Sequence, residues 1–295
     1  MVLQSIVGPK RIKKVPAKSF FLGFIYAAIA VILAYFIFPD DPSISIIFLT
    51  TLAALPLLID VLTIEQEEGK EIIAKTKKRP LIKEHLDVFM IFTYMFFGFV
   101  LCYIAVYIAF PVEYSNLFFS KQIETIVSIV GPGGFFAMPQ ISGALVASES
   151  ALRIIMINNF KVLLFCVLFS FLYGAGAIFV LAWNASILAV AMGNFIKREI
   201  AAFVELFGFA SVQAYFYAGT FGIARYMIHG LPEIAAYFLG AIAGGIISAA
   251  VIKTDYKDPR FYDILFDSLD LIALAALLII IAAILEVGVT PLIIS

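Results

Sequence analysis

Long charge-free apolar stretches alternate with short charged segments along the whole chain. A helix needs about 20 apolar residues to cross the hydrocarbon core of a bilayer, and stretches near that length predict seven membrane-spanning helices. They are Phe20–Phe38, Pro42–Ile59, Val88–Val112, Val162–Ile196, Leu206–Ala224, Ile234–Ile252 and a last stretch between Asp270 and Glu286. The pattern therefore predicts an all-α, polytopic membrane helix bundle.

The stretch Val162–Ile196 is too long for a single crossing. Asn184, Ser186 and Gly193 suggest a break near residue 184, followed by a second short segment. From Ile196 to Phe207 the pattern becomes amphipathic, with Lys197, Arg198, Glu199 and Glu205 on one face. We expect this part to form a helix lying on the inner membrane surface.

Another charge-free stretch, Thr125–Ser148, is rich in helix breakers. It contains Gly131, Pro132, Gly133, Gly134, Pro139 and Gly143. These residues argue against one straight span. We expect a re-entrant or surface-lying segment, covered by protein if it enters the bilayer, within an outer segment 112–156.

Composition and charge support a membrane protein. Of the 295 residues, 63% are hydrophobic and 14% are charged, and the mean hydropathy is +1.06. Soluble domains average about 45–50% apolar and about 25% charged residues. With seven spans, most Lys and Arg residues gather on one side, which places the N-terminus in the cytoplasm and the C-terminus outside. Membrane lipids are the expected surroundings, and no basic tract indicates nucleic-acid binding.

Polar side chains in or beside the predicted spans are the main functional candidates, because such groups are costly in a bilayer. The predicted topology puts five of them on the outer side: Asn158, Asn159, His229, Glu233 and Glu286. Arg225 and Asn184 are secondary candidates. The cluster is either a hydrogen-bond network joining helix ends or an outward-facing cavity for an ion, a proton or a lipid headgroup.

A turn is predicted around Gly230 and Pro232. Arg225, His229 and Glu233 surround it at a spacing of four residues. Glu233 is then either a capping residue at a helix start or the partner of His229 in a protonatable pair.

Small residues repeat every four positions on both sides of this turn. Gly222 closes the first series, and Gly240 and Gly244 belong to the second. Small residues let membrane helices approach closely, so we expect a tight antiparallel hairpin. A homodimer interface is the alternative use of these faces.

Motifs for catalysis, cofactors or metals are missing from the sequence. There is no zinc-protease, nucleophile-elbow, P-loop or potassium-filter motif. Cys102 and Cys166 lie in apolar spans and are interpreted as core residues. An intramembrane hydrolase using His229 and Glu233 would lack a nucleophile. We therefore expect no catalytic residue, no cofactor and no metal site.

An ordered set of polar and glycine positions resembles the stage II sporulation protein M family over roughly residues 88–291. The set comprises Asn158-Asn159-x-Lys161, Gly174-x-Gly176, Asn184, Gly193, His229-Gly230-x-x-Glu233, the glycines from 240 to 245, and Glu286 with Thr290-Pro291. The resemblance implies a non-enzymatic multi-pass protein of a prokaryotic plasma membrane that assembles other proteins. It also divides the chain into an added N-terminal part, 1–87, and a family-like part, 88–295.

Two functional hypotheses follow. The first is a self-associating membrane scaffold, favoured as a dimer, that binds protein partners through segment 112–156 or the charged cytoplasmic loop 64–87. The second is a transporter or channel for an ion, proton, small molecule or lipid, in which Glu233 and Glu286 bind the proton or cation.

Overall fold

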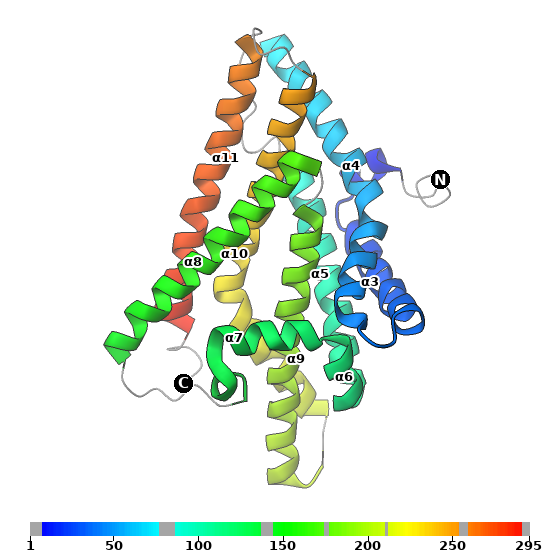
Figure 1. The fold of residues 1–295 in the computed structure, drawn as a ribbon, viewed down its shortest axis with the longest axis vertical. Helices are drawn as coiled ribbons and strands as arrows, with labels where there is room; N and C mark the ends of the chain where they lie inside the picture. Colours follow the sequence, from blue (N-terminus) through cyan, green and yellow to red (C-terminus); the bar gives the residue numbers. More distant parts are fainter. Residues whose placement is uncertain are drawn as a thin grey trace.

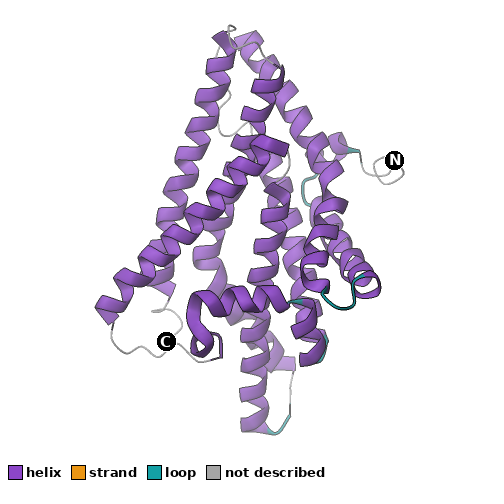
Figure 2. Ribbon diagram, viewed as in Figure 1, coloured by secondary structure: helices purple, strands orange, loops and turns teal. Residues whose placement is uncertain are grey.

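The computed structural model describes residues 8–76, 86–136, 144–173, 177–209, 212–253 and 259–290. These residues form helices and the turns between them, and none is in a strand (Figures 1 and 2). The helices are α2 (Pro9–Lys14), α3 (Lys18–Ile37), α4 (Pro42–Thr76), α5 (Leu86–Ala109), α6 (Val112–Phe118), α7 (Ser120–Phe136), α8 (Ala144–Tyr173), α9 (Ala177–Phe207), α10 (Val212–Lys253), α11 (Pro259–Ile284) and the π-helical turn η2 (Leu285–Val289).

The prediction of an all-α polytopic membrane bundle is confirmed. Within the described residues, seven helical segments are long and apolar enough to cross a bilayer. They are Lys18–Ile37, Pro42–Glu65, Leu86–Ala109, Leu152–Phe171, Ala177–Phe207, Tyr226–Ser248 and Phe261–Val289. Cys102 and Cys166 are buried in this bundle, in agreement with their interpretation as core residues.

The predicted break near residue 184 is wrong. Helix α8 ends at Tyr173 and α9 begins at Ala177, so the stretch Val162–Ile196 contributes to two spans. The side chains taken as breakers are satisfied by α9 itself: Asn184 donates to the carbonyl of Val180, at 2.7 Å, and Ser186 to that of Trp183. Hydrogen bonds of this kind let polar residues sit inside a helix.

The predicted turn at Gly230–Pro232 and the antiparallel hairpin around it are also wrong. Helix α10 runs for 42 residues through both positions. The turn lies earlier, at Gly208, which has a positive φ of 78°. Leu206–Ala224 is consequently not a separate span. Proline is tolerated inside a membrane helix because neighbouring groups can satisfy the backbone that it frees.

The corrected helix boundaries change the expected position of the amphipathic stretch at the end of α9. Ile196–Phe207 is the last part of α9 and not a helix on the inner surface. Its Lys197 donates to the carbonyl of Phe110, just beyond the end of α5. We name this end of the bundle, with α6 and α7, the α7 end; the opposite one, with α2, is the α2 end (Figure 1). Lys197 and Arg198 therefore lie at the α7 end, away from the basic α2.

Glycines allow the central helices to approach closely. In α3, Gly23 faces the backbone carbonyl of Met95, and in α5, Gly98 faces that of Phe20. A side chain at either position would collide with the opposite backbone. Further along α5, the ring of Tyr107 packs on Gly193 of α9. Contacts of this type are how helices associate in lipid.

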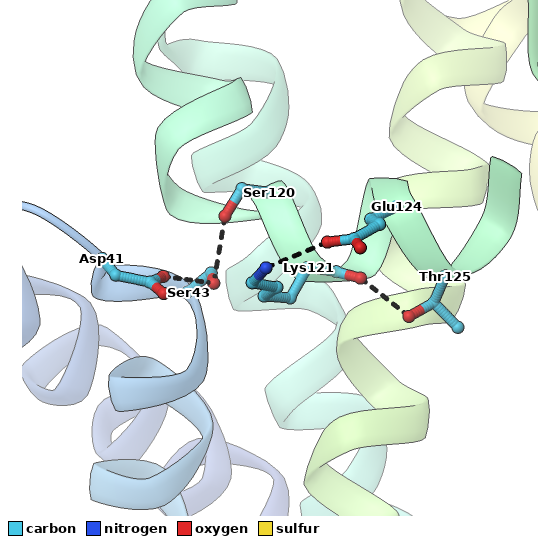
Figure 3. A network of polar contacts seen from close by, with 6 residues as sticks. All are labelled: Asp41, Ser43, Ser120, Lys121, Glu124 and Thr125. Carbon is cyan, nitrogen blue, oxygen red and sulfur yellow. Dashed lines mark hydrogen bonds and ion pairs between the residues drawn. The ribbon is translucent and has the colours of Figure 1, made fainter. Parts of the chain in front are cut away.

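The predicted outer segment 112–156 contains α6, α7 and the first turns of α8. Helix α7 lies across the bundle at one end (Figure 1), and the described part of the segment before Leu152 contains no candidate span. Ser120 ties its start to α4 by donating to Ser43, which in turn donates to Asp41 (Figure 3). Of the predicted breakers, Gly131–Gly134 lie within α7, while Pro139 and Gly143 lie outside the described residues.

Helix α2 is fixed to the end of the second span. The Lys13 ammonium contacts the carboxylates of Glu65, at 2.7 Å, and Glu68. Burial acts to lower the pKa of Lys13, but hydrogen bonds and charges from both glutamates outweigh it and raise the pKa above 10.5. The predicted loop 64–87 thus begins as helix up to Thr76, and residues 77–85 lie outside the described residues.

Candidate functional site

Two acidic side chains, one on α10 and one on η2, interact electrostatically. Glu233 lies in the first half of the α10 span, where it accepts a hydrogen bond of 2.7 Å from the hydroxyl of Tyr237. Tyr237 is one turn later on the same helix and is fully buried. The carboxyl group of Glu286 lies close enough to interact electrostatically with both Glu233 and Tyr237.

A π-helical turn presents Glu286 to α10. Residues Leu285–Val289 form this turn at the end of α11, which packs along α10. A π turn holds one more residue than an α turn, so it shifts which side chains face a neighbouring helix, and such turns are frequent at functional sites. The turn also brings Thr290 into position: its hydroxyl lies 3.2 Å from Nδ1 of His229.

Asn159 approaches the same region from α8. Its side chain is only 3% exposed. Its oxygen accepts a bond from Asn158, but its Nδ2 has no hydrogen-bond partner among the described residues. An unpaired amide is costly in an apolar environment, so this group is a candidate ligand donor.

The glycine contacts of α10 with α8 determine which residues of α10 lie at the same level as Asn159. Gly240 packs on Leu163 of α8, and Gly244 on the backbone of Val167, so the two helices run parallel. One helical turn back along both helices, Asn159 is level with Ala236 and Tyr237. The predicted packing role of Gly240 and Gly244 is therefore fulfilled within one chain, against α8.

The remaining predicted residues lie elsewhere. Asn184 is bonded within α9. Gly222 packs near Phe195 of α9. Arg225 belongs to α10, but its side chain is outside the described part of the structure. Because α10 is continuous, Glu233 is not a capping residue at a helix start.

The assembled group, which we call the α10–η2 cluster, consists of Asn159, His229, Glu233, Tyr237, Glu286 and Thr290. Tyr237 was not predicted, although it is four residues after Glu233 on the same α-helix and so shares its face. Thr290 was named in the family resemblance but not as a site residue. Two electrostatically coupled carboxyl groups and several neutral oxygens suit a proton or a monovalent cation. In the described part of the chain, no three His, Cys, Asp or Glu side chains are grouped to hold a metal ion.

A second feature is a helical hairpin at the α7 end. The last turns of α9, the turn at Gly208 and the first turns of α10 extend past α6 and α7 (Figure 1). Large apolar side chains cover this α9–α10 hairpin, residues 199–224: Leu206 is 78% exposed, Val212 87% and Phe216 76%. Such an apolar surface is typical of a site that meets lipid or another protein.

Comparison with models of known protein families, with curated proteins and with solved structures found no match for this chain.

Proposed function

We propose that the protein is a non-enzymatic membrane scaffold that binds a partner protein through the α9–α10 hairpin. The proposal agrees with the sequence resemblance to the stage II sporulation protein M family. Its main support is the apolar surface of the hairpin, with Leu206, Val212 and Phe216 almost fully exposed.

The lengths of the helices support this use of the hairpin. Helix α9 has 31 residues and α10 has 42, which correspond to about 46 Å and about 63 Å. The hydrocarbon core is only about 30 Å thick. The candidate span within α10 begins at Tyr226, so Val212 and Phe216 lie beyond it. When a partner covers apolar side chains in that position, the free energy of the system falls.

The test is co-purification from the native host after mild cross-linking, with mass determination of the particle. A variant carrying Phe209→Ser and Phe216→Ser should lose a stoichiometric protein partner. The matched control carries Phe21→Ser and Phe36→Ser, which change equally exposed rings within the α3 span. A particle containing only this chain, unchanged by the hairpin variant, would contradict the scaffold proposal.

A second candidate function is transport of a proton or a monovalent cation. The proximity of Glu233 and Glu286 inside the candidate spans supports it. Purified protein in liposomes should then carry flux that Glu233→Gln and Glu286→Gln abolish while the melting temperature stays unchanged. The control is Glu113→Gln, on the exposed α6. Equal flux in all four proteins would reject this candidate.

For the orientation, we propose that the α2 end faces the cytoplasm of a prokaryotic cell. The basic residues of α2 and the start of α3 lie there: Arg11, Lys13, Lys14 and Lys18. Basic segments favour the cytoplasmic side. Because both natural cysteines are buried, single cysteines at Val212 and Leu86 can report the topology. An impermeant maleimide should label Val212→Cys in intact cells and Leu86→Cys only after permeabilisation.

A further inference from the structure

A cavity of about 830 Å³ opens between the end of α5, α6, α7 and α9. Polar groups line one part of it, including Ser115, Asn194, Lys197 and Arg198. Apolar side chains of α7, Ile123 and Val127, line another part. Its volume lies within the range of about 300–1,000 Å³ that is typical of small-molecule sites.

The charge of Lys197 has no acidic partner among the described residues. Its ammonium donates to the Phe110 carbonyl, at 3.2 Å, and to the Ser115 hydroxyl, at 3.1 Å. It also lies 4.8 Å from the centre of the Tyr107 ring. These three contacts hold the cation in place but leave its charge uncompensated.

The carboxylate nearest to this cation along the cavity wall is already paired. Glu124 of α7 accepts a hydrogen bond from Lys121, at 3.0 Å (Figure 3). The two charges of that pair largely cancel. The cavity therefore offers the positive charge of Lys197 to an anion.

The cavity lies at the boundary of the hydrocarbon core. The α5 span ends at Ala109, next to Phe110. Counting about 20 residues from the start of α9 at Ala177 reaches the position of Lys197. Lipid headgroups occupy this level of a bilayer, and tyrosine and lysine side chains are common there.

We propose that this cavity binds the phosphate group of an anionic phospholipid. The phosphate pairs with Lys197, the polar side chains contact the glycerol and headgroup oxygens, and the acyl chains leave along Ile123 and Val127. This apolar wall favours a lipid over free phosphate, because free phosphate has no apolar part that could pack against it. The proposal requires no protein partner and is independent of the scaffold function.

A purely structural role for Lys197 makes a different prediction. Its bond to the Phe110 carbonyl satisfies a backbone group beyond the end of α5, where a cation is also favoured by the helix dipole. If this is its only role, Lys197→Gln lowers the melting temperature and has no effect on lipid binding once the protein is folded.

The test is native mass spectrometry of the purified full chain with phosphatidylglycerol, phosphatidylcholine or inorganic phosphate added. We expect retention of phosphatidylglycerol, reduced about tenfold by Lys197→Gln and restored largely by Lys197→Arg. Ala201→Phe should also reduce it, by filling the cavity from α9 one turn beyond Lys197 while the Lys197 ammonium is kept. Lys161→Gln, on α8 outside this cavity, is the control with the same change of charge.

The variants also decide between the possible outcomes. Should Lys197→Gln fail to fold, the comparison of Ala201→Phe with the parent protein still tests the site. Equal retention of both lipids, or equal loss in Lys161→Gln, would overturn the proposal. Competition by inorganic phosphate, together with no preference for phosphatidylglycerol, would overturn the lipid assignment and identify a phosphate solute as the ligand.

Discussion

Tyr237 donates a hydrogen bond to Glu233 across one turn of α10, with their oxygen atoms 2.7 Å apart. The bond lies inside a candidate span, where no water replaces a lost partner. It therefore holds the carboxyl group of Glu233 in place beside α10.

Replacing Tyr237 by Phe should destabilise the protein by about 1–3 kcal/mol, the usual cost of leaving a buried polar group without its hydrogen-bond partner. Thermal unfolding in detergent or nanodiscs measures this change. Tyr217→Phe is the control, since Tyr217 lies on the same helix with its ring about half exposed. An unchanged melting temperature in both variants would show that Glu233 does not depend on the hydroxyl.

The packing of α10 on α8 predicts opposite effects for two glycines of one helix. An added methyl at Gly244 meets the Val167 carbonyl, whereas at Gly219 nothing lies within 4 Å. Gly244→Ala should therefore cost about 1–3 kcal/mol through overpacking. Gly219→Ala should stabilise the protein by up to about 1 kcal/mol through helix propensity. Equal melting temperatures for the two variants would contradict the parallel α8–α10 contact.

The ion pair of α2 predicts a loss of stability in strong alkali. The pKa of Lys13 is raised in the folded protein. The ion pair therefore contributes fully to the free energy of unfolding below the pKa of lysine in the unfolded chain, about 10.4. This stabilisation is lost as the pH rises through the higher pKa that Lys13 has in the folded protein. The melting temperature of the parent protein should fall more steeply above this pH than that of Lys13→Met.

The same variant tests the burial of Glu65. Lys13→Met leaves that carboxylate, only 5% exposed, without its cation, and breaking a buried pair from one side costs about 3–5 kcal/mol. Adding Glu65→Gln to Lys13→Met should recover much of the loss. A double variant that is less stable than Lys13→Met would contradict this account.

A buried amide in α7 predicts a stabilising substitution. Gln122 is fully buried, and both polar atoms of its side chain lack hydrogen-bond partners among the described residues. Gln122→Leu has similar size and removes this penalty, about 1–3 kcal/mol for an unsatisfied buried group. The melting temperature should rise. A fall would indicate that the amide binds a group such as water in the folded protein.

Sequence reasoning predicted the class of fold and most of the α10–η2 cluster. The thickness of the bilayer sets the length of a charge-free membrane-spanning stretch, and this explains why the number of spans was predicted correctly. The cost of polar groups in lipid singled out Asn159, Glu233 and Glu286. Tyr237 was missed, and Thr290 was not singled out as a site residue, because tyrosine and threonine are ordinary residues in membrane helices and give no such signal.

The predicted ends of the helices were wrong where glycine and proline were interpreted by the rules that hold for helices in water. In a bilayer the backbone keeps its internal hydrogen bonds, so α10 continues through Gly230 and Pro232. One span too few was counted before Ile196 and one too many after it. The first error put Lys197 on the same side as α2, whereas it lies at the opposite end of the bundle. The second cancelled it, so His229 and Glu286 were still placed together.

The continuity of α10 gives the molecule a mechanical connection from one end to the other. Its first turns belong to the apolar hairpin, and its later ones carry Glu233 and the glycine contacts with α8. Pro232 cannot donate to the carbonyl of Ile228, so α10 lacks one backbone hydrogen bond directly before Glu233. The missing bond lies between the hairpin and the α8 contact, so this turn is where a force on the hairpin would bend the helix.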